Sequence, residues 1–141
     1  MEIQREGCYE PETAEALQNA YSETGSAAQA VLKAAAKAME FEASEYDERV
    51  TDAVLETAHE ALFASLLVVY RGPRNAFETW CENHQYSVDL AGSDSVESVA
   101  WHPVALNETV VAASYQHEPE AAAATVRRRA FGQCYRQQLQ G

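Results

Sequence analysis

The segment that decides the fold runs from Tyr86 to Tyr115 and reads YSVDLAGSDSVESVAWHPVALNETVVAASY. In Tyr86–Leu90 apolar and polar side chains alternate with the period of a half-buried strand, and Gly92–Ser95 has the composition of a turn. Two further strands are predicted at Val99–Val104 and Thr109–Tyr115, close enough to form a hairpin. We therefore predict a three-stranded antiparallel meander.

Upstream of this segment the apolar side chains recur with the helical period of about 3.6 residues. Gly25 is predicted to end a first helix and Ser26 to cap a second. Thr51 is an N-cap candidate, and the wide apolar face of the helix after it indicates a central, mostly buried helix. The predicted helices are Pro11–Gly25, Ser26–Met39, a short one within Glu40–Val50, Asp52–Tyr70, one from Asn75, and a long closing helix, Glu120–Leu139.

This order of elements predicts one α+β domain over residues 1–141, in which four to five N-terminal helices and a long C-terminal helix pack on one face of the antiparallel sheet. Residues 11–84 form its helical part, 85–117 the sheet and 118–140 the C-terminal helix. A chain of this length suffices for one core without disulfides or metal.

The charge is strongly acidic, with 22 acidic against 10 basic residues and a net charge of −12. Lysine occurs only at Lys33 and Lys37. Such a surface repels itself in dilute buffer, but at 1 M salt the Debye length falls to about 3 Å and the repulsion is screened. We therefore predict a halophilic protein, for which the net charge excludes no class of partner.

The first residues have neither the basic nor the apolar region of a secretion signal, so we expect a cytoplasmic protein. The longest nearly apolar run, Ala61–Tyr70, is too short to cross a bilayer, and no membrane partner is expected. Glycines stand singly, which excludes the phosphate-binding loops of nucleotide enzymes. The three cysteines are odd in number, and we expect reduced thiols.

Two clusters could hold a metal ion. Cys81 and His84 are three residues apart near a predicted helix end, and sulfur with imidazole suits zinc. Two ligands do not complete a site, so a buried thiol beside a surface histidine is the simpler interpretation. The acidic cluster within Glu40–Glu48 lacks the ligand spacing of a calcium loop and is interpreted as a solvated face. No metal or cofactor is predicted.

His102 is the candidate general base, because histidine titrates near neutrality. No nucleophile or carboxylate is tied to it by spacing, so a packed or sheet-edge histidine is the simpler interpretation. The hairpin places it opposite Val111 or Ala112, far from His117, so no histidine pair is expected. An enzyme would have its pocket near Trp101 and His102, with Tyr115 close by.

The basic concentration lies at Arg127, Arg128 and Arg129, with Arg136 beyond them. Three consecutive helical residues fan over roughly 200°, so only Arg129 and Arg136 are predicted to share a side. These arginines either pair with carboxylates of this chain or of a second subunit, or contact nucleic acid. They are the candidate binding residues, together with Trp101.

Five stretches of the chain stand out: AQAVLKAAAKAM (28–39), EYDERVT (45–51), ETAHEALFASLL (56–67), VAWH (99–102) and ATVRRRAFG (124–132). Together they resemble a haloarchaeal family of small acidic proteins classed as a domain of unknown function. The resemblance spans about residues 11–135 and implies a cellular context but no activity.

Three functions remain open from the sequence. The first is a non-enzymatic interaction or scaffold protein with a protein partner or a homo-oligomeric state, suggested by the alanine-rich helices and the lack of an assembled catalytic set. The second is a nucleic-acid-associated regulator that uses the C-terminal arginines, and the third is a small enzyme with its pocket near Trp101 and His102.

Overall fold

A computed structural model describes residues 2–93 and 95–140; Asp94, in the predicted turn, lies outside this part of the chain. The helices are α1 (Ala14–Ala38), α2 (Ala43–Arg49), α3 (Asp52–Ser65), α4 (Arg74–His84), α5 (Pro119–Ala130) and α6 (Arg136–Gln140), with a 3₁₀ turn at Ala105–Asn107 and a π-helical segment at Phe131–Tyr135. The strands are β1 (Gln4–Glu6), β2 (Val69–Pro73), β3 (Ser87–Ala91), β4 (Ser98–Val104) and β5 (Thr109–Tyr115). The mixed α+β class is confirmed, with more strands than predicted.

In the described part of the chain the strands form one sheet in the order β1-β2-β4-β5-β3. β4 and β5 are the predicted antiparallel hairpin, with His102 opposite Val111. β3, however, pairs with β5 in parallel, so the predicted antiparallel meander is wrong. The reason is that β2 occupies the other edge of β4, which leaves β3 only the outer edge of β5.

Strand β2 begins with Val69 and Tyr70, which were predicted to end a helix. α3 begins as predicted, since the Thr51 hydroxyl accepts the Val54 N–H at 3.3 Å, but it ends at Ser65. The run that follows, 67–69, is fully buried and contains two β-branched valines. Such a short apolar run fits a buried strand as well as a helix, and β-branching favours the strand. The prediction of a mostly buried helix is also wrong, because Phe63 is the buried residue of α3.

Helix α1 continues through Gly25, so the predicted helix end at Gly25 and the cap at Ser26 are wrong. A glycine inside a helix costs about 1 kcal/mol relative to alanine. Here the alanine-rich sequence on its C-terminal side and the packing of α1 against α3 offset that cost. Gly25 lies against the ring of His59, which faces it from α3.

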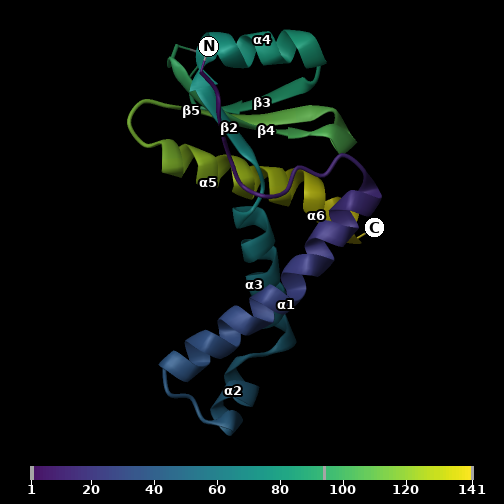
Figure 1. Cartoon of the computed structure of the whole chain (residues 1–141), viewed down its shortest axis with the longest axis vertical. Coiled ribbons are helices and arrows are strands. Elements are labelled where there is room, and N and C mark those ends of the chain that lie inside the picture. The colour runs from purple at the N-terminus through teal and green to yellow at the C-terminus, as the bar shows by residue number, and fades with distance from the viewer. Residues whose placement is uncertain (1, 94, 141) are drawn as a thin grey trace.

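Helices cover both faces of the sheet rather than one, as Figure 1 shows for α4 and α5. On one face α5 packs together with Leu17 of α1 and Phe63 of α3. On the other, Phe77 of α4 packs on Trp101, with ring centroids 5.3 Å apart. Both layers are needed because successive strand residues point to opposite faces, and residues 99–104 of β4 are all buried.

Away from the sheet, α1 and α3 cross at an angle and pack against each other, and α2 lies at the far end of the molecule (Figure 1). We call residues 26–58 the helical arm. It includes the outer half of α1, all of α2 and the first half of α3. Few of its residues are buried, and α2 has none.

Candidate functional site

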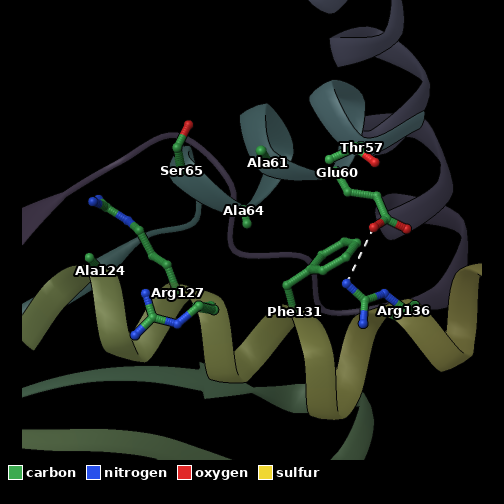
Figure 2. A pocket seen from close by; sticks show the side chains of 10 residues that line it. Thr57, Glu60, Ala61, Ala64, Ser65, Ala124, Arg127, Phe131 and Arg136 are labelled. Carbon is green, nitrogen blue, oxygen red and sulfur yellow. Dashed lines mark hydrogen bonds and ion pairs between the residues drawn. The ribbon is translucent and has the colours of Figure 1, made fainter. Parts of the chain in front are cut away.

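A cleft of about 400 Å³ opens between α3 and the C-terminal helices. Figure 2 shows the ring of Phe131 lying between the two walls. We call this cleft the arginine cleft. Its lining residues are Thr57, Glu60, Ala61, Ala64 and Ser65 from α3 and Ala124, Arg127, Arg128, Phe131 and Arg136 from the C-terminal helices. The cleft thus combines small apolar side chains with three of the four C-terminal arginines.

The π-helical segment determines which arginines meet in the cleft. An α-helix rotates about 100° per residue. A π-helical turn contains one extra residue, so each side chain after it lies about 100° away from the direction that a regular α-helix would give it. Arg136, eight residues after Arg128, therefore faces the same side as Arg128. Arg129 points away and pairs with Asp89 of β3 at 2.8 Å. The prediction that Arg129 and Arg136 share a side is wrong.

Two arginines of the cleft are held by neighbours. Arg127 Nε donates to the carbonyl oxygen of Leu67 at 2.8 Å. The Arg136 guanidinium donates to Glu60 at 3.2 Å, drawn as the dashed line in Figure 2, and lies 5.1 Å from the centre of the Phe131 ring. Arg128 is exposed. Arg129 and Arg136 thus both pair with carboxylates of their own chain, which was one of the two predicted roles.

His102, the candidate general base, is completely buried. Its Nδ1 lies 2.5 Å from the carbonyl oxygen of Val68 and its Nε2 lies 2.7 Å from the Tyr135 hydroxyl. Because a carbonyl only accepts, Nδ1 carries the proton and Tyr135 donates to Nε2. Burial, with a smaller contribution from nearby Arg127, lowers the pKa of His102 from 6.5 to about 4. The imidazole is neutral near pH 7, and both of its nitrogens have hydrogen-bond partners within the core.

Trp101 does not share a pocket with His102. The two residues are adjacent in β4 and point to opposite faces of the sheet, Trp101 toward α4 and His102 toward Tyr135. Both are fully buried, whereas Tyr115 is partly exposed at the end of β5. The pocket predicted near Trp101 and His102 therefore does not form as expected.

The metal candidates stay separate from further ligands. Burial raises the pKa of the Cys81 thiol, which disfavours the thiolate that a metal would need. His84 stacks on Trp80 with ring centroids 4.0 Å apart, and its Nδ1 donates to the Trp80 carbonyl oxygen. Over residues 2–93 and 95–140, no three histidine, cysteine, aspartate or glutamate residues come together in a way that could hold a metal ion.

The α3 wall of the cleft could not be predicted from the C-terminal arginines alone, since Glu60, Ala61 and Ala64 lie more than 60 residues earlier in the chain. One signal was present in the sequence. Thr57, Ala61 and Ala64 recur at helical spacing and form a stripe of small side chains, which allows another helix to approach.

Fold and site together define a small α+β protein with a mixed sheet and a cationic cleft between helices. The chain belongs to DUF5809, a family of unknown function whose model matches residues 8–136. No curated protein and no solved structure matches the chain. The predicted membership of a domain family of unknown function is thus confirmed, while the haloarchaeal origin stays a prediction.

Membrane insertion was not expected from the sequence. In the part of the chain that the structure describes, no helix is both long enough and apolar enough to cross a membrane.

Proposed function

We propose that this protein is a non-enzymatic interaction module that self-associates through the outer half of α1. The observation that carries the proposal is an exposed apolar stripe on the helical arm. We call it the alanine stripe, and it consists of Ala27, Ala30, Val31, Ala34, Ala35 and Ala38. Val31 alone leaves 59 % of its surface exposed.

The alanine stripe suits a second copy of the same helix. Small side chains let two helix backbones approach closely, and a twofold pair places the same surface on both sides of the contact. A stable protein interface buries about 800 Å² on each partner, which is more than one face of four helical turns provides. We therefore expect a reversible dimer with a Kd of about micromolar order.

Charge favours this surface over the others. Residues 26–39 contain no acidic residue and carry both lysines, Lys33 and Lys37, in a chain of net charge −12. Two copies that meet along the outer half of α1 therefore bring together few like charges. The same composition supports the remaining part of the proposal, a halophilic protein in the cytoplasm, because multimolar salt would screen the repulsion between the other surfaces.

The environment of His102, Cys81 and Cys134 supports a non-enzymatic role. His102 is enclosed in the core with both ring nitrogens hydrogen-bonded. Burial raises the pKa of both the Cys81 and the Cys134 thiols, which leaves them poor nucleophiles. A general base or nucleophile must reach its substrate, and these three groups lack that access or that reactivity.

The nucleic-acid alternative has weaker support. Arg129 and Arg136, two of the four C-terminal arginines, pair with Asp89 and Glu60. A phosphate backbone would have to compete with these contacts in a salty medium, where phosphate binding weakens steeply.

The test is sedimentation velocity in about 2 M KCl over a hundredfold range of protein concentration. We expect the wild type to shift from monomer to dimer and Val31→Glu to remain a monomer, because the new carboxylates would face each other. Val88→Glu is the matched control: Val88 is 50 % exposed on the edge strand β3, and this variant should dimerise like the wild type.

A wild type that stays monomeric throughout, or a dimer that Val88→Glu disrupts and Val31→Glu does not, would overturn the assignment of the alanine stripe. If the protein stays monomeric but binds a different protein through Val31, the alanine stripe is a binding surface for that protein and the self-association proposal is wrong.

A further inference from the structure

We propose that the arginine cleft is a binding site for an organic anion, a molecule with an apolar body and one carboxylate, sulfonate or phosphate group. The inference is independent of the proposed self-association, because the cleft lies between α3 and the C-terminal helices and shares no residue with the alanine stripe.

The size of the cleft fits a small molecule. Its volume of about 400 Å³ lies within the roughly 300–1,000 Å³ that is typical of ligand pockets. Its walls are largely apolar, with Ala61 and Ala64 on α3 facing the ring of Phe131 (Figure 2). An inorganic ion would leave these apolar surfaces in contact with water, whereas an aromatic or aliphatic body would cover them.

The charge of the cleft is opposite to that of the chain. Three arginines and one glutamate line it, in a protein whose net charge is −12. The glutamate, Glu60, is paired with Arg136. The positive charge of Arg127 and Arg128 is therefore left for an acidic group, and a guanidinium can bind a carboxylate, sulfonate or phosphate through two parallel hydrogen bonds.

Two of the arginines are already positioned. The bond from Arg127 Nε to Leu67 uses one donor and leaves the terminal nitrogens of that guanidinium for a ligand. Arg136 is fixed by Glu60 and by the Phe131 ring. Binding would therefore order fewer side chains than it would on an unanchored arginine cluster.

The π-helical segment is a second, independent feature that points to this place. Isolated π-helical turns are rare and recur at functional sites. In this chain the segment brings Arg136 to the side of Arg128 and places Phe131 between the helices. A regular α-helix would instead align Arg136 with Arg129, outside the cleft.

A nucleic-acid backbone fits this geometry less well. The cationic groups surround one concavity rather than forming a row, and the apolar wall of α3 faces them. A single acidic group on an apolar body meets both walls at once.

The experiment compares three probes on the full chain in about 0.5 M KCl. They are 8-anilinonaphthalene-1-sulfonate, its uncharged analogue N-phenyl-1-naphthylamine, and inorganic sulfate. Fluorescence titration and calorimetry give affinity and stoichiometry, and amide chemical shifts locate the site. We expect the sulfonate to bind once per chain at least fivefold more tightly than the neutral analogue, with shifts confined to α3 and the C-terminal helices, and sulfate to bind weakly.

Variants test the two walls separately. Ala61→Trp should fill the cleft and weaken both aromatic probes by tenfold or more. Arg128→Gln should weaken the sulfonate about fivefold and leave the neutral analogue within twofold, because the exposed Arg128 contributes charge and not core packing. Arg49→Gln removes an exposed arginine from α2 and is the matched control, with no expected change.

The inference is overturned if the sulfonate and its neutral analogue bind with equal affinity, or if Arg49→Gln weakens binding as much as Arg128→Gln does. It is also overturned if Ala61→Trp leaves both affinities unchanged, once circular dichroism has shown that this variant is folded. Val31→Glu should leave probe binding unaltered, so failure of the self-association proposal and failure of this one give different results. Loss of probe binding in Val31→Glu alone would place the probe on the alanine stripe and would also overturn the inference.

Discussion

The sheet and the helical arm are stabilised in different ways. Residues 99–104 of β4 are all buried, and helices cover both faces of the strand. In the arm, the outer half of α1 buries Ala28 and Ala36, and α2 buries nothing. Burial of apolar surface is the main stabilising contribution in folding. We therefore expect the arm to open locally at a lower free energy than the sheet.

The arm is held at its base by specific contacts between α1 and α3. The ring of His59 stacks on Tyr21 with centroids 3.7 Å apart, and its Nε2 lies 2.6 Å from the Tyr21 carbonyl oxygen. The Thr24 hydroxyl donates to the same carbonyl. Beyond this point, helix propensity has to supply much of the order, and the alanines of α1 are the best residues for it.

The largest expected effect comes from removing the aromatic side chain at the centre of the sheet. Trp101→Ala should lower the free energy of unfolding by about 3–5 kcal/mol, because the cavity would lie between Phe77, Tyr70 and the strand. Chemical denaturation measures the change.

The control belongs to the arm. Met39→Ala removes a side chain that is 65 % exposed and should change stability by less than about 0.5 kcal/mol. If the two substitutions cost the same, the contrast between sheet and arm is wrong.

The second prediction concerns acid. The pKa of His102 is about 4 in the folded protein and about 6.5 in the unfolded chain. Between these values the unfolded state binds a proton that the folded state does not, so stability falls as the pH is lowered from 6.5 to 4. The loss attributable to His102 should approach about 3 kcal/mol near pH 4.

The measurement is the free energy of unfolding from pH 7 to pH 4 for the wild type and for His102→Gln. Protonation of the many carboxylates contributes to both proteins, so the difference between the two curves isolates His102. His102→Gln should be less stable at neutral pH, because the Val68 and Tyr135 contacts change, but should lose less on acidification. Parallel curves would contradict a buried neutral histidine.

How much of this could be predicted depends on the range of the interactions. The hairpin register, the Thr51 cap and the start of the helix predicted from Asn75 depend on neighbouring residues, and they are found in the structure. Strand β2 was missed because the buried apolar run 67–69 leads into it directly after α3, and only pairing with the distant β4 distinguishes strand from helix. The parallel position of β3 follows from the same omission.

The candidate site shows the same limit. The arginines were singled out from their charge, but their grouping depends on the π-helical turn at Phe131–Tyr135, which changes the helical phase of Arg136. Helical periodicity assumes a constant angle per residue, so it aligned Arg129 with Arg136. The α3 wall required knowledge of which helices pack together.

The smallest expected effect makes the contrast sharpest, because one substitution should act with opposite sign in the two regions. Gly25 lies inside α1, where a Cβ would meet the His59 ring at 3.4 Å, an ordinary contact distance. Gly25→Ala should therefore stabilise the arm by about 0.5–1 kcal/mol through helix propensity, seen as slower amide exchange in α1.

Gly92, at the end of β3, has φ +101°, and a Cβ there would collide with the Ser114 side chain. Gly92→Ala should destabilise the sheet by more than about 1 kcal/mol. If Gly25→Ala is also destabilising, α1 is strained at its glycine, and the arm is held by its contact with His59 rather than by propensity.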